Sequence, residues 1–243
     1  MRYSEKMQLP FYFATENGTV SLANVVNLVQ RVSENQLAHL GEGMEALTSH
    51  GIGWIITQSQ LEFTRALRAE EDVTVWTEAR SYNRLLCYRD YGIDAADGTP
   101  IVRVSSTWAM MDLQKRRIIP VVEAAMAGIG AVADSKVKRL PRLAKMETPT
   151  GHQEYRVRYF DIDGNHHVNN VHYLDWMLDP LGDEFLNTHT PKTVNIKYAR
   201  EVERDSQVLS EYAWQTETHT QSLHQISVAG SSNAEAEITW QEV

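Results

Sequence analysis

The stretch LANVVNLVQRVSENQLAHL, residues 22–40, sets the architecture of the first half of the chain. Its apolar side chains recur at roughly helical spacing, so that one face of a helix would be apolar. Ser21 precedes the stretch and Gly41 follows it, and these residue types commonly start and end helices. The pattern therefore predicts one long amphipathic helix. Its apolar positions are Leu22, Val25, Val26, Val29, Val32 and Leu37.

Strand-like runs follow this helix. Each is rich in β-branched and aromatic residues, and Asp97-Gly98 forms a turn signal between the last two runs. The runs predict an antiparallel meander behind the helix. They cover residues 51–63, 72–82, 85–94 and 101–112.

The second half of the chain repeats this order after a segment of weaker periodicity at residues 113–150. A strand is predicted at residues 152–160 and a helix near residues 168–179. Two similar units therefore follow one another along the chain. The strands expected after the second helix lie near residues 193–200, 206–217, 222–229 and 235–241.

A weak sequence similarity between the two halves supports this repeat. Setting Gly18 against Gly164 aligns residues 22–25 with residues 168–171, an offset of 146. Neither half alone would bury both faces of its sheet, so we expect the halves to pair into one compact body. Two further alignments pair residues 61–65 with 196–200 and residues 72–77 with 205–210. We place an N-terminal unit at residues 1–130, a linker at 131–150 and a C-terminal unit at 151–243.

Composition restricts the class of protein. The chain has 243 residues, of which 42% are hydrophobic and 23% are charged, a profile typical of a globular protein with a sizeable core. No apolar run approaches the roughly 20 residues of a membrane helix, and the first residues lack the pattern of a signal peptide. We therefore expect a cytoplasmic protein without membrane insertion. A formal net charge of −9 argues against general nucleic-acid binding.

Cysteine usage excludes two further kinds of site. The chain has a single cysteine, Cys87, in a predicted strand. One cysteine can form neither a disulfide framework nor a thiolate metal cluster. We expect Cys87 to pack in the core.

The densest polar run in the chain is RYFDIDGNHHVNN, residues 158–170, between a predicted strand and a predicted helix. Backbone N–H groups at a helix N-terminus can hold a developing oxyanion, and the amides near His167 and Val168 are candidates. The side chain of Asn165 could donate to the same oxygen. His167 could bind a carbonyl, orient water or move a proton, and Asp163 could orient its neighbours.

Structural and metal-binding alternatives apply to the same run. Asp163 and Asn165 are also ordinary turn and cap residues. A calcium loop does not fit, because Gly164 falls at loop position four and His172 stands where a glutamate is needed. A zinc site lacks an evident second group of ligands. We therefore expect chemistry without a metal.

At this point the sequence resembles a family. Residues 161–176, DIDGNHHVNNVHYLDW, are similar to the signature of the acyl-acyl carrier protein thioesterases. The resemblance continues in YRDY at 88–91, STWAMMD at 106–112 and YARE at 198–201. It implies an α+β tandem double hot-dog fold, with two units that each carry a long central helix wrapped by a curved antiparallel sheet. It also implies hydrolysis of fatty acyl-carrier protein thioesters to free fatty acid and carrier protein, without a cofactor.

The resemblance assigns roles to four residues. Asp163, Asn165 and His167 match the loop positions of the family, and Glu201 matches its acidic residue on the facing strand. Plant members have a cysteine after that glutamate, whereas this chain has Val202. Cysteine catalysis is therefore not expected, and a water activated by Glu201, together with His167, is the remaining simple mechanism.

The repeat predicts one active site per chain. By the offsets above, the counterparts of Asn165, His167 and Glu201 in the first half are Thr19, Ser21 and Ala66, and none of them can replace its partner. The interior of the first half could instead hold the acyl tail, although core packing explains the same residues equally well. The candidates are Trp54, Ile55, Ile56, Val26, Val29, Trp108 and Met110.

The implied partner is acyl carrier protein, which is acidic, so an acidic enzyme needs a local positive surface to attract it. Residues 113–150 carry eight basic and three acidic side chains, a net charge of +5. A solvated linker explains this segment equally simply. A homodimer is also possible. The docking candidates are Arg116, Arg117, Lys136, Lys138 and Arg139.

Other activities stay open from the sequence. A thioesterase that acts on coenzyme A esters would use the same pantetheine arm. A non-catalytic acyl-thioester sensor would need no general base, and all four polar positions are present here. A hydratase of the same fold would act on an unsaturated acyl chain without releasing a thiol.

Overall fold

The computed structural model describes residues 1–41 and 47–243. The chain forms two compact units. The first unit comprises Met1–Leu9, Asn27–Leu61 and Glu70–Leu140, and the second comprises Pro10–Val26, Glu62–Ala69 and Pro141–Val243. These units follow contacts rather than a division of the chain at residues 130 and 150, because two early segments pack with the C-terminal residues.

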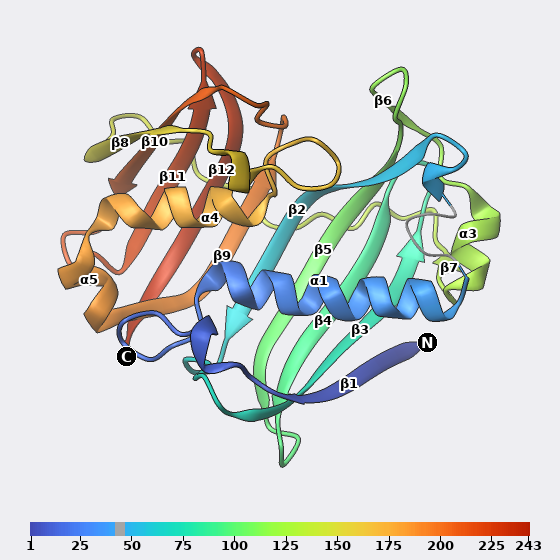
Figure 1. The fold of residues 1–243 in the computed structure, drawn as a ribbon, viewed down its shortest axis with the longest axis horizontal. Helices are drawn as coiled ribbons and strands as arrows, with labels where there is room; N and C mark the ends of the chain where they lie inside the picture. Colours follow the sequence, from blue (N-terminus) through green and yellow to red (C-terminus); the bar gives the residue numbers. More distant parts are fainter. Residues whose placement is uncertain (42–46) are drawn as a thin grey trace. The chain divides into compact units, whose positions relative to one another are not determined.

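The predicted long helix is α1, Leu22–His39. Ser21 starts it by accepting a hydrogen bond from the Asn24 N–H at 3.2 Å. Gly41 follows it in the left-handed conformation, with φ of 71°. Figure 1 shows α1 lying across the strands of the first unit. The helix prediction and both of its end signals are confirmed.

The sheet of the first unit has the strand order β1-β3-β4-β5-β2. The pairs β1–β3, β3–β4 and β4–β5 are antiparallel. The predicted meander is confirmed for β3, β4 and β5, but it is wrong for β2, which lies beside β5 rather than beside β3. The first strand was not predicted, because its alternation leaves polar and charged side chains on both faces. The strands are β1 Arg2–Gln8, β2 Ile52–Phe63, β3 Asp72–Tyr82, β4 Cys87–Ala95 and β5 Pro100–Asp112. Short additions are β6 Arg117–Ile119, α3 Glu123–Gly128 and β7 Val132–Ala133.

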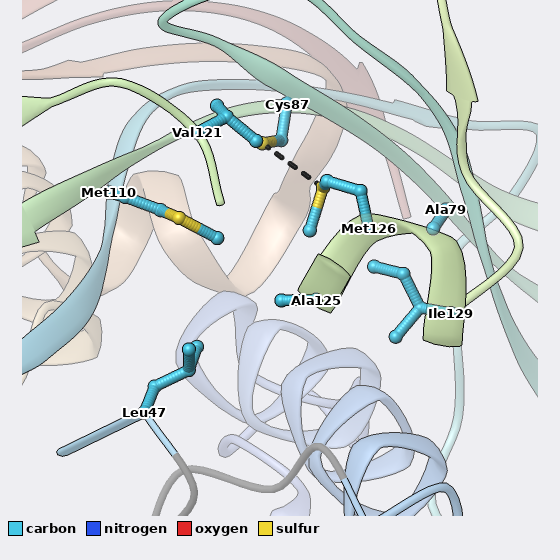
Figure 2. Close-up of a cluster of buried hydrophobic side chains, with 8 residues drawn as sticks. All are labelled: Leu47, Ala79, Cys87, Met110, Val121, Ala125, Met126 and Ile129. Atoms are coloured by element: carbon cyan, nitrogen blue, oxygen red, sulfur yellow. Dashed lines mark hydrogen bonds between the residues drawn. The ribbon is translucent and has the colours of Figure 1, made fainter. Parts of the chain in front are cut away.

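A hydrophobic cluster closes the first unit around α3 (Figure 2). Cys87 and Met126 meet there, with 3.5 Å between their sulfur atoms. Burial raises the pKa of the Cys87 thiol to about 12, so the thiol stays neutral. The expected packing role of Cys87 is confirmed. The other cluster members are Leu47, Ala79, Met110, Val121, Ala125 and Ile129.

The sheet of the second unit has the order β9-β12-β11-β10-β8, and its neighbouring strands are antiparallel. Its main helix, α4, covers Val171–Leu178 and lies across the sheet in Figure 1. The helix begins three residues later than predicted and leads through Asp179–Leu181 into α5, Asp183–Thr188. The strands are β8 Gly151–Arg156, β9 His189–Tyr198, β10 Gln207–Trp214, β11 Gln221–Val228 and β12 Ser231–Glu242.

Beneath α4 the second unit contains a chain of buried polar groups. The Trp240 indole N–H donates to the Ser222 hydroxyl at 2.8 Å, and this hydroxyl lies 2.8 Å from Nε2 of His224. Burial lowers the pKa of His224 to about 4, so its imidazole is neutral near pH 7. The interior of the second unit therefore contains a buried, neutral histidine.

Across residues 1–41 and 47–243, every helix is too short or too polar to span a bilayer.

Candidate active site

The predicted catalytic loop is a tight hairpin between β8 and α4. Asp163 N–H donates to the His167 carbonyl at 2.9 Å, and His166 N–H donates to the Asp163 carbonyl at 3.0 Å. Ile162 and Val168 form the β-bridge that closes the hairpin. His166 occupies the left-handed region with φ of 67°, as a hairpin turn of this kind requires. The strand predicted through residue 160 therefore ends at Arg156, before this loop.

An ion pair anchors the start of the hairpin. The fully buried Asp161 accepts hydrogen bonds from the Arg158 guanidinium at 2.7 and 3.0 Å and from the Arg158 N–H at 2.7 Å. Burial would raise the pKa of Asp161, but the bonds from Arg158 lower it below its ordinary value. Tyr159 and Phe160 between them are exposed. The entry into the loop is therefore fixed by a charged pair rather than by apolar packing.

The structure brings His167 and Glu201 together. Nε2 of His167 lies 3.3 Å from a carboxylate oxygen of Glu201, and both side chains are partly exposed, at 26% and 33%. Glu201 lies just after β9, on a segment without regular secondary structure. The Val168 N–H donates to the Val202 carbonyl at 3.2 Å and so joins this segment to the loop. An imidazole and a carboxylate at this distance can share a proton and remain open to water.

Asn165 and Asp163 occupy the turn of the same loop. A carboxylate oxygen of Asp163 accepts the Asn165 N–H at 2.8 Å, which fixes the main chain of Asn165. The Asn165 carboxamide is exposed and makes no hydrogen bond to any residue that the structure describes. It is therefore a side-chain donor that a carbonyl oxygen could reach.

The prediction that the Val168 amide could hold an oxyanion is wrong. The Val168 N–H is already bonded to the Val202 carbonyl, and α4 starts at Val171 rather than at Val168. At the start of α4, the side-chain oxygen of Asn169 accepts the Val171 N–H at 3.2 Å. A carbonyl in this loop would therefore depend on the Asn165 carboxamide rather than on the Val168 amide.

The same hairpin occurs a second time, before α1. Thr15 N–H donates to the Thr19 carbonyl at 2.8 Å, and Gly18 N–H donates to the Thr15 carbonyl at 2.9 Å. The bridge between Ala14 and Val20 matches that between Ile162 and Val168. These matches set the offset between the loops at 148, because each residue number differs by that amount.

The offset corrects two expected counterparts. Asn165 corresponds to Asn17 rather than to Thr19, and His167 corresponds to Thr19 rather than to Ser21. The offset of 146 paired Gly18 with Gly164, but the left-handed residue of the second loop is His166. Ala66 remains the counterpart of Glu201, because the Val20 N–H donates to the Leu67 carbonyl at 2.7 Å as the Val168 N–H does to Val202.

Asn17 has a structural role in the first loop. Its side-chain N–H donates to the Leu186 carbonyl at 2.8 Å, and its side-chain oxygen accepts the N–H and hydroxyl of Thr19 at 2.9 and 2.7 Å. Ala66 offers no proton acceptor and lines a cavity of about 270 Å³. The first loop therefore keeps the backbone and the asparagine without the imidazole and carboxylate.

The residues expected to line an acyl pocket are placed as follows. Met110 belongs to the hydrophobic cluster of the first unit, and Trp54 and Trp108 pack against it half-buried. The Trp108 indole N–H donates to the Ser106 hydroxyl at 2.7 Å. Val26 and Val29 are buried on α1, and Ile55 and Ile56 are half-buried on β2. Three of the candidates thus meet in one cluster.

The docking candidates are exposed. The Lys138 ammonium donates to the Ser81 hydroxyl at 3.0 Å and lies 3.8 Å from Asp134. The main-chain N–H of Lys138 donates to the Tyr88 hydroxyl at 3.0 Å. Arg117 lies on β6, Arg116 in the turn before it, and Lys136 and Arg139 flank Lys138.

Metal ligands are not grouped in the described ranges: residues 1–41 and 47–243 contain no cluster of three or more His, Cys, Asp or Glu side chains that could hold an ion.

Sequence reasoning missed two residues beside the site, Tyr173 and Asn233. Tyr173 lies inside the quoted signature but was given no role, and its hydroxyl accepts the Val202 N–H at 2.7 Å. Asn233 lies on β12, and its side chain donates to the Glu201 carbonyl at 3.0 Å. No local pattern marks Asn233, because its contact depends on how β12 pairs with β9.

Each unit thus packs helices on an antiparallel sheet, which defines a hot-dog-like α+β class. The second unit adds a loop with an exposed carboxamide and with an imidazole that lies beside a carboxylate. Two family models identify the class further. The model for the acyl-ACP thioesterase N-terminal domain matches residues 1–129, and that for the C-terminal domain matches residues 144–242. The chain belongs to the acyl-ACP thioesterase family.

Relatives and solved structures agree with this family. The oleoyl-acyl carrier protein thioesterase of Coriandrum sativum, described as chloroplastic, is 28% identical over 227 residues, which cover 86% of this chain and 61% of the relative. The dodecanoyl-[acyl-carrier-protein] hydrolase of Cinnamomum camphora, also described as chloroplastic, is 26% identical over 204 residues, covering 77% and 53%. The chain thus spans about three fifths or less of these relatives.

A crystal structure described as an oleoyl thioesterase from Lactobacillus plantarum has a TM-score of 0.95 and 32% identity, covering 100% of this chain and 97% of that one. The 12:0-ACP thioesterase of Umbellularia californica has a TM-score of 0.88 and covers 100% and 98%. At 20% identity this second likeness concerns the fold alone.

Proposed function

We propose that this chain hydrolyses fatty acyl-acyl carrier protein thioesters to a free fatty acid and the carrier protein thiol. The observation that carries the proposal is the 3.3 Å approach of His167 to Glu201 beside the Asn165 loop, in a member of the acyl-ACP thioesterase family. The named relatives are hydrolases of oleoyl and dodecanoyl carrier-protein esters.

The geometry supports a water-based mechanism. Asn165 donates to the thioester carbonyl oxygen, and the carboxylate of Glu201 takes a proton from a water molecule that attacks the carbonyl carbon. The carbon–sulfur bond then breaks, and the proton returns through the His167–Glu201 pair to the departing sulfur. General-base assistance is typically worth about 10²- to 10⁴-fold in rate, and an oxyanion donor about 10²- to 10³-fold.

Asp163 acts through Asn165 in this proposal. Its carboxylate holds the Asn165 N–H and so keeps the carboxamide at the tip of the turn. Val202 follows Glu201 and carries no nucleophile, and the only thiol in the chain, Cys87, is buried in the first unit. Attack by water rather than by a side chain is therefore the simplest chemistry.

We propose a tandem double hot-dog arrangement for the whole chain, with residues 1–130 as the unit that accepts the acyl tail, residues 131–150 as a linker and residues 151–243 as the catalytic unit. The matching hairpins at an offset of 148 support descent of both halves from one unit. Trp54, Trp108 and Met110 are the strongest pocket candidates because they meet at one cluster. Val26, Val29 and Ile56 remain further candidates.

The proposed partner surface is the basic segment 113–150. Exposed Arg116, Arg117, Lys136 and Arg139 would steer an acidic carrier protein toward the enzyme more than they would tighten the complex. Lys138 lies in the same segment, and its ammonium also contacts Ser81 and Asp134. A rate of association that falls as salt rises is the expected signature.

The test is thiol release from a panel of acyl chains, each presented on acyl carrier protein and on coenzyme A. Glu201→Gln removes the proton acceptor, and Glu203→Gln is the matched control, because Glu203 is an exposed carboxylate on the same segment. Turnover that favours carrier-protein esters and is lost only in Glu201→Gln supports the proposal. Preference for coenzyme A esters would change the carrier, and acyl binding without thiol release would contradict hydrolysis.

A further inference from the structure

The segment that carries Glu201 has no regular secondary structure of its own. The strand β9 ends at Tyr198 and β10 begins at Gln207, so residues 199–206 form a loop. A carboxylate that activates water must nevertheless be held in a defined direction. Contacts from elsewhere in the second unit have to supply this rigidity.

Tyr173 of α4 holds the main chain on both sides of Glu201. Its hydroxyl oxygen accepts the Val202 N–H at 2.7 Å, and the hydroxyl donates to the Arg200 carbonyl oxygen at 3.5 Å. The side chain is buried, with 3% exposed. Burial raises the pKa of Tyr173 to about 12, although the bond from Val202 lowers it, so the hydroxyl stays protonated and can donate.

Asn233 of β12 holds the same segment from a second direction. Its side-chain N–H donates to the Glu201 carbonyl at 3.0 Å. The main-chain carbonyl of Asn233 accepts the N–H groups of Ala199 and Arg200 at 2.8 and 3.1 Å. Residues 199–202 are thus bonded at consecutive main-chain positions by one helix residue and one strand residue.

The first loop shows that the fold does not need the tyrosine. Its counterpart at the offset of 148 is Val25, which is buried and has no hydroxyl. The loop still reaches its facing segment there, through the 2.7 Å bond from the Val20 N–H to the Leu67 carbonyl. The hydroxyl contact therefore occurs in the loop that faces Glu201, and it is absent from the loop that faces Ala66.

We propose that Tyr173 is a positioning residue for hydrolysis: its hydroxyl fixes the main chain on either side of Glu201 and so directs the carboxylate toward His167 and the attacking water. Asn233 is the second anchor of the same segment. The inference rests on the proposed role of Glu201 as the proton acceptor.

The first test is Tyr173→Phe, which removes one oxygen and keeps the ring. We expect kcat for thioester hydrolysis to fall about tenfold to a hundredfold, since small misplacements of a catalytic group can cost that much, while KM stays nearly constant. The acid limb of the pH–rate profile should also shift, because the surroundings of the His167–Glu201 pair change. Asn233→Ala should reproduce this in a milder form, since the main-chain bonds of residue 233 survive.

A double-mutant cycle separates positioning from folding. In a Glu201→Gln background, Tyr173→Phe should cost little further activity, because there is no proton acceptor left to aim. Tyr155→Phe is the matched control. Tyr155 also packs on α4, 5.9 Å from the Trp176 ring, but its hydroxyl donates to Asp179. This variant should keep the wild-type pH–rate profile.

The outcomes distinguish the two proposals. Unchanged kcat and pH profile in both Tyr173→Phe and Asn233→Ala, while Glu201→Gln abolishes turnover, would overturn the positioning role alone. Full additivity in the cycle would overturn it as well, since it would mean that Tyr173 acts independently of Glu201. If Glu201→Gln itself hydrolyses normally, the proposed function of the carboxylate fails first.

Discussion

The chain builds one hairpin twice, before α1 and before α4, and the two copies share a backbone but differ in side chains. Each copy is closed by a β-bridge and has two main-chain hydrogen bonds within its turn. Each also contains one residue in the left-handed conformation, Gly18 in the first copy and His166 in the second. The copy before α4 presents His167 to Glu201 at 3.3 Å, whereas the copy before α1 has Thr19 and Ala66 at these positions.

The comparison teaches that residue identity alone does not mark the site. An asparagine occupies the turn in both copies, yet Asn17 is bonded to Leu186 and Thr19, while the Asn165 carboxamide is exposed without a bond to a described residue. The two loops differ in the residues that surround the asparagine. The loop with Asn165 lies beside Glu201 and Tyr173, whereas the corresponding positions near Asn17 are Ala66 and Val25.

The largest expected effect comes from truncating the two asparagines. Asn165→Ala should lower kcat/KM by about 10²- to 10³-fold, the usual cost of losing an oxyanion donor, with little change in Tm. Asn17→Ala should leave the rate per folded molecule unchanged and lower the free energy of unfolding by about 1–3 kcal/mol, because it leaves the Leu186 carbonyl and the Thr19 N–H without their partner.

Thiol-release kinetics and thermal unfolding of the two variants test this prediction side by side. The same loss of activity in both would mean that the loops are not functionally distinct. An Asn165→Ala enzyme that is fully active would remove the carboxamide from the mechanism.

The second unit buries His224, which should make the stability of this unit depend on pH. Its pKa is lowered from 6.5 to about 4 in the folded state. Below about pH 6.5 the unfolded chain binds a proton that the folded chain does not, so stability falls as pH falls from about 6.5 to 4, by up to about 3 kcal/mol.

Tm measured from pH 4 to pH 7 checks this sign. His224→Gln keeps a hydrogen-bonding side chain beside Ser222 but cannot titrate, so its profile should be flatter than that of the wild type over this window. Parallel profiles would mean that the imidazole is protonated in the folded protein.

The sulfur cluster of the first unit should matter for stability and not for catalysis. Cys87→Ser places a hydroxyl where the thiol packs against Met126, and a buried hydroxyl without a partner costs about 1–3 kcal/mol. Activity at a temperature where the variant is folded should remain near that of the wild type. Cys87→Ala is the control without a polar atom, and a large loss of turnover in both variants would bring the thiol back into the mechanism.

Local patterns in the sequence predicted the regular elements well. Helix α1 and strands β2 to β5 lie close to their predicted ranges, because hydrophobic periodicity and turn residues act over a few positions. β1 was not predicted because one face carries Arg2 and Lys6 and the other face, with Tyr3 and Met7, is interrupted by Glu5. The predicted strand before the site was too long, because the Arg158–Asp161 pair turns the chain at Tyr159.

The candidate site was predicted only as far as single residues. The signature named His167, and Glu201 came from a segment more than thirty residues later, but their 3.3 Å contact depends on tertiary packing. Pairing Gly18 with Gly164 gave the wrong offset for the repeat, because the residue in the left-handed conformation of the second loop is His166. Tyr173 and Asn233 gain their meaning from main-chain groups, which carry no sequence signal.

That misalignment yields the smallest and most specific prediction, a difference between two glycine substitutions. Gly18 has φ of 79°, where an L-residue is strained, so Gly18→Ala should lower the free energy of unfolding by about 1 kcal/mol. Gly164 does not have positive φ, and an added Cβ would meet nothing within 4 Å. Gly164→Ala should therefore be neutral or stabilise by a few tenths of a kcal/mol through the unfolded chain, about the lower end of the usual range.

Denaturant unfolding of the two variants and of His166→Gly completes the comparison. Relief of the left-handed backbone at residue 166 should offset part of the flexibility that glycine adds, so this change should cost less than a glycine substitution usually does. Equal losses in Gly18→Ala and Gly164→Ala would favour the offset of 146. A loss confined to Gly18→Ala supports the offset of 148, and with it the pairing of Asn17 with Asn165 on which the contrast between the loops depends.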